Sequence, residues 1–184
     1  MYRVVPQKPL EAANREMVEH RASGYRQFQI KVGNDWKGDI ERIISAASLL
    51  ESGESAFADA NRGWTLHEAV QVVRAVRDTG VMIEQPCASY EECLHVRSHC
   101  DLPMKLDECI TDLRMAQRLV VDKAAEVVCL KISNLGGLTK ARRIRDYLVA
   151  HGLSVVCEDT WGGELTAAEV AHFAAPTPTA TLYH

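Results

Sequence analysis

The sequence predicts an α/β protein with a (β/α)8 barrel of the TIM type, incomplete here and made of about seven βα units. Three observations lead to this prediction. Short apolar runs alternate with longer segments of helical periodicity, the units recur roughly every 25 residues, and polar residues follow one apolar run after another. Strands that alternate with helices at this spacing form a parallel sheet with right-handed crossovers. Because barrel active sites collect at the C-terminal strand ends, the recurring polar residues favour a barrel over an open sheet.

Six short apolar runs are the candidate strands. They cover residues 28–32, 56–60, 82–84, 104–106, 127–132 and 154–157. Val4 and Val5 form the tail of a further strand before them.

The longer segments between these runs carry the helical period. They cover residues 9–23, 35–50, 65–78, 89–100, 112–121, 138–150 and 164–174. Two of them open with a capping box, in which a Ser or Thr precedes the helix and a Glu follows three residues later. The two pairs are Thr65 with Glu68 and Ser89 with Glu92.

The chain is expected to be a single catalytic barrel domain, residues 1–184, cut from a longer protein. Its first strand is represented only by the last residues, and residues 181–184 fall where an eighth strand should begin. We therefore expect the last strand and a C-terminal tail to be absent. No Gly/Ser-rich linker or low-complexity tract divides the sequence.

Composition excludes several classes of function. The chain has 21 basic and 25 acidic residues and no basic stripe, so we expect no nucleic-acid partner. No apolar run approaches the length of about 20 residues that spans a membrane, and the N-terminus lacks the apolar stretch of a signal peptide. The six cysteines form no Cys-x-x-Cys pair, which indicates reduced, mostly buried thiols in a cytoplasmic protein.

Three acidic residues end three successive predicted strands, at Asp59, Glu84 and Asp107. They are 25 and then 23 residues apart, one βα unit each. Neighbouring strand ends of a barrel are adjacent, so the three carboxylates should converge and repel one another unless a cation lies between them. Hard oxygen ligands select Mg²⁺ or the similar Mn²⁺. The alternative is that each is a solvated loop acid or a helix cap.

Two lysines flank these acids at the ends of further strands. Lys31 precedes Asp59 by 28 residues, and Lys131 follows Asp107 by 24. A lysine at the end of a buried strand is costly without compensation, and a nearby divalent metal should lower the pKa of its ammonium. A lysine tuned in this way can act as a general base near neutral pH. Either lysine alone could instead be a surface residue whose stem lies over apolar groups.

The ordered set of motifs resembles the mandelate racemase/muconate lactonizing enzyme branch of the enolase superfamily. The set comprises Lys31, Asp-Ala-Asn at 59–61, Glu-Gln-Pro at 84–86, Leu-Asp-Glu at 106–108 and Lys131. The resemblance implies that Asp59, Glu84 and Asp107 ligate Mg²⁺, and that Lys31 and Lys131 are acid/base groups on opposite faces of the substrate. One difference is that the branch often has Lys-x-Lys on the second strand, where this sequence has Gln29 before Lys31.

The resemblance also implies a mechanism and parts that lie outside the chain. A lysine removes the α-proton of a carboxylate substrate, and the metal stabilises the resulting enediolate. Reprotonation from the other lysine gives a racemase or epimerase, whereas loss of a β-hydroxyl gives a dehydratase. Members of the family carry an N-terminal capping domain that contributes much of the specificity, and it is absent from this sequence.

Local phrases resemble the members that act on proline derivatives. The phrases are Glu-Gln-Pro-Cys at 84–87, Lys-Ile-Ser-Asn-Leu-Gly-Gly at 131–137 and Glu-Asp-Thr-Trp-Gly-Gly at 158–163. These members include cis-3-hydroxy-L-proline dehydratases and 2-epimerases of proline betaine or 4-hydroxyproline betaine. Trp161 is a candidate to stack on a substrate ammonium, and Asp159 to pair with the same cation. A packed aromatic at the barrel rim is the alternative for Trp161.

Three further residues are expected to support the site. Asn61 and Glu108 lie beside metal ligands in the sequence and are expected to orient them. Lys105 shares a strand face with Asp107 by the period of two, which favours a structural ion pair inside the barrel. None of the seven histidines matches the His base that other enolase branches carry near the seventh strand.

The sequence therefore predicts a Mg²⁺-dependent lyase, with dehydration of cis-3-hydroxy-L-proline as the leading reaction. Stereochemistry favours it because two lysines on opposite faces suit an anti elimination, with Lys31 as the base and Lys131 as the acid. The first alternative is an isomerase, a proline betaine 2-epimerase. The second is an inactive metal-binding barrel fragment. The expected partners are a small amino-acid or betaine carboxylate and, in the full-length protein, further copies of the same chain.

Overall fold

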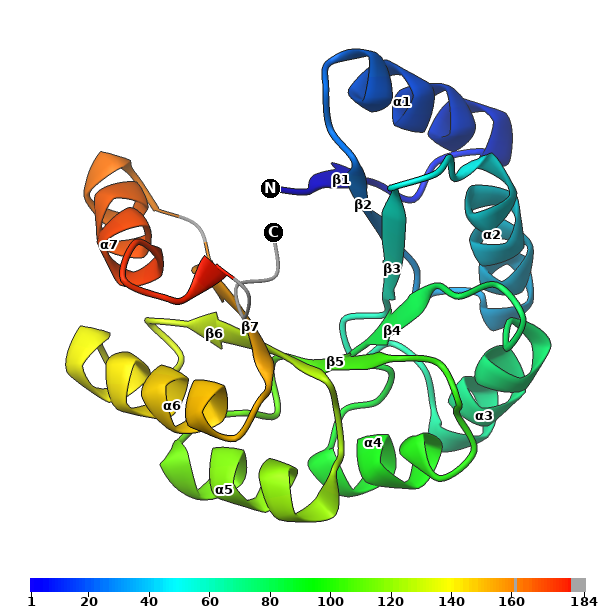
Figure 1. The fold of residues 1–184 in the computed structure, drawn as a ribbon. Coiled ribbons are helices and arrows are strands. Elements are labelled where there is room, and N and C mark those ends of the chain that lie inside the picture. The colour runs from blue at the N-terminus through cyan, green and yellow to red at the C-terminus, as the bar shows by residue number, and fades with distance from the viewer. Residues whose placement is uncertain (161, 180–184) are drawn as a thin grey trace. The chain divides into compact units, whose positions relative to one another are not determined.

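The computed structural model of the chain describes residues 1–160 and 162–179. Its contacts divide the chain into two compact units, of which the first comprises Met1–Met104 and the second begins at Lys105. Each unit is a series of βα repeats, which can be followed along the colour gradient of Figure 1.

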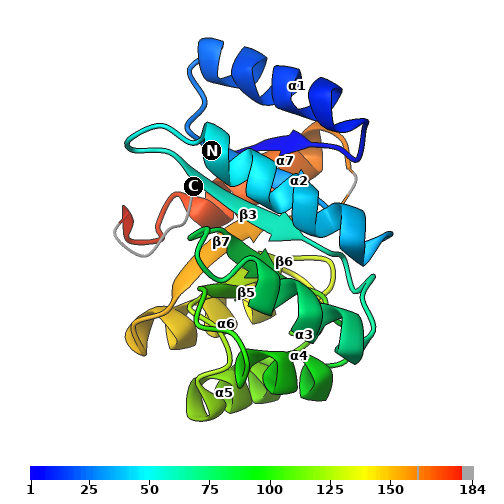
Figure 2. The same cartoon turned by 90° about the vertical axis from the view of Figure 1, so that its right-hand side faces the viewer.

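The first unit contains four parallel strands in the order β1-β2-β3-β4. Its elements are β1 (Arg3–Val5), α1 (Leu10–Ala22), β2 (Gln27–Lys31), α2 (Trp36–Leu49), β3 (Ser55–Asp59), α3 (Leu66–Ala75), β4 (Met82–Glu84) and α4 (Tyr90–Arg97). Each helix contacts the next one along the chain, and Figure 2 shows α1 and α2 side by side.

The second unit contains parallel strands in the order β5-β6-β7. Its elements are β5 (Met104–Leu106), which begins at the last residue of the first unit, α5 (Leu113–Asp122), β6 (Val127–Lys131), α6 (Leu138–Ala150), β7 (Ser154–Glu158) and α7 (Glu164–Ala174). Helix α6 contacts both α5 and α7.

The predicted elements are confirmed, including the strand at Val4 and Val5. The two largest shifts are at α4, which the sequence extends to residue 100 and which ends at Arg97, and at α3, which the sequence extends to residue 78 and which ends at Ala75. Val76 is fully buried although it lies outside the helix, so the apolar period continues beyond the last helical turn. The chain then turns, with Thr79 donating its backbone N–H to the carbonyl of Val76 at 3.0 Å.

Both predicted capping boxes are present. The hydroxyl of Ser89 accepts from the backbone N–H of Glu92 at 3.2 Å, and the Glu92 carboxylate accepts from the Ser89 backbone at 3.0 Å. Thr65 and Glu68 make the same reciprocal pair at the start of α3. These hydrogen bonds satisfy donors that the first helical turn leaves without an intrahelical partner, so the boxes fix where α3 and α4 begin.

The period of two along each strand separates core residues from chemical ones. On β2, Phe28 and Ile30 are almost completely buried in the core, while the alternate positions carry Gln29 and Lys31. The parallel register pairs Lys31 with Asp59 at the C-terminal end of the strands. The fold therefore places Lys31 and Asp59 together at the C-terminal ends of β2 and β3.

The helices of the described residues are mostly short and carry charged side chains. None combines sufficient length with sufficient apolar character to cross a bilayer.

Candidate active site

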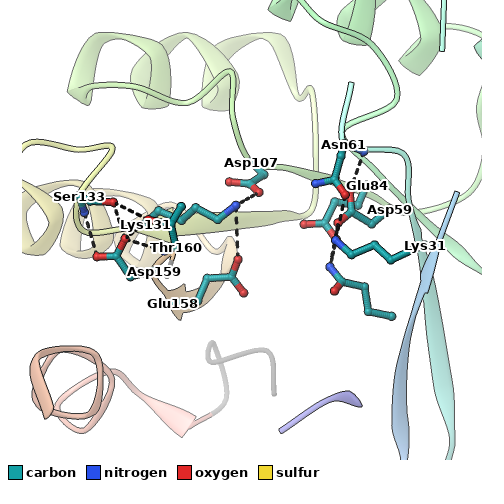
Figure 3. Close-up of polar contacts among 11 residues, drawn as sticks. Lys31, Asp59, Asn61, Glu84, Asp107, Lys131, Ser133, Glu158, Asp159 and Thr160 are labelled. Atoms are coloured by element: carbon teal, nitrogen blue, oxygen red, sulfur yellow. Dashed lines mark hydrogen bonds and ion pairs between the residues drawn. The ribbon is translucent and has the colours of Figure 1, made fainter. Parts of the chain in front are cut away.

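The first unit brings three predicted site residues together at the ends of adjacent strands. Lys31 on β2 is the register partner of Asp59 on β3, and Asp59 is the register partner of Glu84 on β4. Both carboxylate residues are about 1% exposed, and Lys31 Nζ lies 2.5 Å from Asp59 Oδ2 (Figure 3). The ammonium therefore supplies part of the positive charge that buried carboxylates require.

Two amide side chains complete this group. Gln29 Nε2 donates to Asp59 Oδ2 at 2.9 Å and to Glu84 Oε2 at 3.1 Å, so the two carboxylates lie side by side around one nitrogen. Asn61 accepts from Lys31 Nζ at 2.9 Å through its side chain, and its backbone N–H donates to Asp59 Oδ1 at 2.9 Å. Asn61 adopts a φ of 44°, which turns the chain back over Asp59. These contacts support the predicted role of Asn61 as an orienting group.

The second unit brings Lys131 together with two carboxylates. Its ammonium contacts Asp107 Oδ2 directly and lies 3.7 Å from Glu158 Oε1 (Figure 3). Burial would lower the pKa of Lys131, but Asp107, with smaller contributions from Cys129 and Glu158, raises it above its usual range. Burial raises the pKa of Asp107 to about 6, with Glu108 and Glu158 adding to the rise and Lys131 opposing it.

Cys129 and Glu158 are site residues that the sequence analysis missed. Ligand atoms of Asp107, Cys129 and Glu158 lie within 4.8 Å of one another, the one such group of three among the described residues. One signal was available in the sequence, since Cys129 shares a strand face with Lys131 by the period of two. Glu158 is placed beside Lys131 by the β6–β7 register, which the sequence does not give.

Asp159 is engaged by the loop that follows Lys131. Its Oδ2 accepts the Ser133 backbone N–H at 3.0 Å, and its Oδ1 accepts the Ser133 hydroxyl and the Thr160 backbone N–H (Figure 3). Burial would raise the pKa of Asp159, but these hydrogen bonds outweigh it and hold the pKa below its usual range. Trp161, the other predicted substrate contact, lies outside the described residues.

The remaining predicted residues, Lys105 and Glu108, are close to Asp107 in the sequence. Lys105 is fully buried on the strand face that it shares with Asp107, as the period of two predicts. Glu108 is half-buried and raises the pKa of the adjacent Asp107. The ion pair predicted for Lys105 and the orienting role predicted for Glu108 stay predictions.

The carboxylates fit the hard divalent cation that the motifs imply. Asp59 and Glu84 each have a buried oxygen within hydrogen-bond distance of Gln29 Nε2. Asp107 is a further buried carboxylate, in the second unit. Two carboxylates at this spacing repel each other unless a positive charge compensates them. Carboxylate oxygens are the ligands that Mg²⁺ and Mn²⁺ prefer.

The chemistry of the strand ends and the βα repeats define a barrel of the enolase type. The sequence matches the family described as “Enolase C-terminal domain-like” over residues 12–184. The chain belongs to this family, within the mandelate racemase/muconate lactonizing enzyme branch of the enolase superfamily. The predicted fold class is thereby confirmed, with seven βα units in the described residues.

Two curated relatives indicate the range of reactions. The chain is 44% identical over 178 residues to a cis-3-hydroxy-L-proline dehydratase from Roseibium aggregatum, covering 97% of this chain and 48% of that protein. It is 30% identical over 138 residues to an N-succinyl-L-Arg/Lys racemase from Bacillus cereus, covering 70% of this chain and 37% of that protein. The chain thus spans about half the length of the dehydratase that it matches.

Two solved structures from Roseovarius nubinhibens ISM share the fold. A mandelate racemase/muconate lactonizing enzyme is 58% identical, with a TM-score of 0.95 over 100% of this chain and 51% of that chain. A member of the enolase superfamily complexed with magnesium is 34% identical, with a TM-score of 0.94 over 99% of this chain and 50% of that chain. Magnesium binding therefore occurs in this superfamily.

Proposed function

We propose that the full-length protein is a Mg²⁺-dependent lyase that dehydrates cis-3-hydroxy-L-proline. The observation that carries the proposal is that each strand-end lysine contacts a carboxylate expected to bind the metal. Lys31 contacts Asp59 in the first unit, and Lys131 contacts Asp107 in the second. The 44% identity to a dehydratase of this substrate supports the choice of reaction.

In this proposal Asp59, Glu84 and Asp107 hold the metal ion. When bound, Mg²⁺ supplies Lewis-acid stabilisation of the negative charge that develops on the substrate carboxylate. Gln29 and Asn61 hold Asp59 in place through their hydrogen bonds to its two oxygens. Groups of this kind fix the orientation of ligands and affect metal affinity.

The two lysines carry the proton transfers. Lys31, as a neutral amine, accepts the α-proton, and the electron pair of that C–H bond forms the ring double bond. Lys131, as an ammonium, gives a proton to the departing 3-hydroxyl, which leaves as water when its C–O bond breaks. The product is an enamine that rearranges to the ring imine. In the cis isomer the hydroxyl and the α-hydrogen lie on opposite ring faces. A base on one face of the ring and an acid on the other therefore suit this elimination.

The substrate test uses full-length protein with Mg²⁺ in D₂O. Cis-3-hydroxy-L-proline and proline betaine are incubated separately and followed by proton NMR. We expect the ring imine to form from the hydroxyproline and to be lost in Lys31→Ala and Lys131→Ala. Lys123→Ala is the matched control, because this exposed lysine lies at the C-terminal end of α5.

A 2-epimerase of proline betaine is the second candidate, and the racemase relative favours it. Deuterium exchange or inversion in the betaine, without imine formation from the hydroxyproline, would replace the dehydratase by this candidate. No imine from the hydroxyproline and no exchange or inversion in either compound would contradict both enzymes and favour an inactive metal-binding barrel.

The metal site has a separate test that needs no turnover. Asp59→Asn, Glu84→Gln and Asp107→Asn each remove one carboxylate charge and should weaken Mg²⁺ binding roughly 10-fold or more, measured by calorimetry. Asp146→Asn is the control, since this exposed carboxylate pairs with Arg145 on α6. Unchanged affinity in one of the three variants would remove that residue from the ligand set.

A further inference from the structure

The two lysine-bearing loops share one hydrogen-bonding feature. Two residues after Lys31, the backbone N–H of Gly33 donates to Asp39 Oδ2 at 2.8 Å. Two residues after Lys131, the backbone N–H of Ser133 donates to Asp159 Oδ2 at 3.0 Å. In each unit, therefore, a carboxylate holds the chain immediately beyond the lysine.

We propose that Asp39 and Asp159 are positioning residues that hold the two lysines in their working geometry. Each acts through its loop and touches no reacting atom. The inference rests on the proposed function for its catalytic consequences, and it assigns Asp159 to the loop rather than to a substrate cation. An error of 1 Å in the position of a reacting group can lower a rate by about 100-fold, so such groups affect turnover strongly.

Asp39 is well placed for this role because it connects two loops of the site. It lies in the first turn of α2 and is 3% exposed. Besides Gly33, its Oδ2 accepts the indole N–H of Trp64 at 2.9 Å. Gly33 follows β2 and Trp64 follows β3, so one carboxylate joins the loop after Lys31 to the loop after Asp59. The two donors and the positive end of the α2 dipole compensate the buried charge.

The same two loops are in direct backbone contact, which leaves them little freedom to move. A Cβ atom at Gly33 would lie 2.2 Å from the carbonyl oxygen of Ala60, and one at Gly63 would lie 2.1 Å from the carbonyl oxygen of Gly33. Gly33 also has a φ of +105°, which favours glycine. A displacement of the Asp39 carboxylate would therefore shift both loops together.

Asp159 connects two loops of the second unit in the same way. It follows β7, and Ser133 follows β6. Both the backbone N–H and the hydroxyl of Ser133 donate to it, and the Thr160 backbone N–H occupies the same oxygen as that hydroxyl. The Thr160 hydroxyl is a fourth donor, at 3.3 Å from Oδ1. With four donors on the carboxylate, the segment after Lys131 is tied to the loop that follows Glu158.

The alternative is that Asp39 and Asp159 only stabilise the fold. Measuring α-proton exchange and dehydration separately distinguishes this alternative from a positioning role. Asp39→Asn should slow α-proton exchange and dehydration of cis-3-hydroxy-L-proline together, roughly 10- to 100-fold in kcat with little change in KM. Asp159→Asn should slow dehydration by a similar factor while α-deuterium still enters the substrate, because only the loop of the proposed acid is altered. Equal loss of both steps in both variants would overturn the proposal.

Each variant has a matched control. Asp35→Asn changes the exposed N-cap of α2, where Asn caps as well as Asp, and Asp146→Asn changes an exposed carboxylate on α6. Neither should alter exchange or dehydration. If Asp39→Asn fails to fold, Trp64→Phe keeps the ring packing and removes only the indole donor, and it should slow both steps in the same direction.

A chemical readout tests the positioning without turnover and so separates it from the proposed function. Lys31 Nζ is held against Asp59, and its reaction with formaldehyde and borohydride can be followed by mass spectrometry. Asp39→Asn should speed methylation of Lys31 several-fold and leave the methylation rate of Lys131 unchanged. Asp159→Asn should speed methylation of Lys131 several-fold and leave the rate of Lys31 unchanged. Unchanged rates for both lysines would overturn the proposal even if the dehydratase activity is established. If the protein lacks dehydratase activity but the methylation rates change as expected, the positioning role is supported and the proposed function fails.

Discussion

The side-chain amide of Gln29 donates a hydrogen bond of 2.9 Å to Oδ2 of Asp59. The same nitrogen donates to Oε2 of Glu84 at 3.1 Å, so one neutral group supports two buried carboxylates. A hydrogen bond from an amide orients the carboxylates but adds no full positive charge between them. The local negative charge therefore stays available to Lys31 and to a metal ion.

Gln29→Met is expected to destabilise the metal-free protein by about 1–3 kcal/mol, because two charged acceptors lose a buried donor. Mg²⁺ should recover part of this loss, since the ion occupies the lone pairs that the amide leaves. The measurement is thermal unfolding with EDTA and with Mg²⁺, and the Tm difference between the two should be larger in the variant. Equal Tm losses in both buffers would show that Gln29 does not share the ligand oxygens.

The capping box at Ser89 gives a prediction for stability. The hydrogen bond from the Ser89 hydroxyl lowers the pKa of Glu92, and the hydrogen bond from the Ser89 backbone N–H lowers it by a smaller amount. Ser89→Ala should lower the free energy of unfolding by about 1 kcal/mol, because α4 loses the side-chain partner of a first-turn N–H. Urea unfolding measures it. Ser48→Ala is the control: this exposed serine lies inside α2, where alanine is the better helix former, so no loss is expected.

The contact between Gly33 and Gly63 predicts that a single methyl group is harmful. In Gly63→Ala the new Cβ would lie 2.1 Å from a backbone oxygen, which cannot move aside as a flexible side chain would. We expect a loss of about 1–3 kcal/mol in the free energy of unfolding, the usual cost of overpacking. Gly163→Ala is the control because nothing lies within 4 Å of its Cβ position. A Gly63→Ala protein as stable as this control would contradict the observed packing.

Much of the fold and of the site could be predicted from the sequence because both follow from the same repeat of apolar strands that end in polar residues. Apolar runs ending in Lys31, Asp59 and Glu84 predict strands, and a parallel register then brings their last residues together. Thr65 and Ser89 mark helix starts because capping is a local interaction, determined within four residues. For such features the chain neighbours alone decide the outcome.

Features that depend on contacts between distant loops could not be predicted. Asp39 reads as an ordinary first-turn acid, and only the fold shows that it accepts from Trp64, 25 residues away. The contact of Asp159 with Ser133, 26 residues away, could not be predicted either, while the substrate-binding role predicted for Asp159 stays a prediction. Glu158 needed the β6–β7 register to place it beside Lys131. A single sequence does not specify which side chain meets which loop.

The ion pair of Arg21 and Glu54 gives a prediction for pH dependence. Arg21 Nε and Nη2 donate to the two Glu54 oxygens at 2.7 Å each, and Nη2 also donates to the carbonyl of Leu49 at 2.6 Å. This bidentate contact joins the end of α1 to the segment before β3. The Glu54 side chain is 1% exposed, and the Arg21 hydrogen bond lowers its pKa from the usual 4.5.

A carboxyl with a lowered pKa stabilises the folded state at pH values above its unfolded pKa. That stability is lost as the pH falls below about 4.5 and through the folded pKa, because the unfolded chain then binds the proton more readily. Glu54→Gln should cost about 1.5–3 kcal/mol near neutral pH, the typical contribution of hydrogen bonds to charged groups. The cost should shrink at about pH 3.5, since protonation removes the same charge from the wild-type protein.

Urea unfolding at both pH values measures this difference, and Glu51→Gln is the matched control. Glu51 pairs with the same arginine at 3.3 Å, but its side chain is 66% exposed. Solvent screens such a pair, so its loss should change the free energy of unfolding by less than about 1 kcal/mol at either pH. If the two variants behaved alike, the Arg21–Glu54 contact would contribute no more than an ordinary surface pair. A larger loss confined to Glu54→Gln near neutral pH would show that α1 is attached to the sheet through this buried carboxylate.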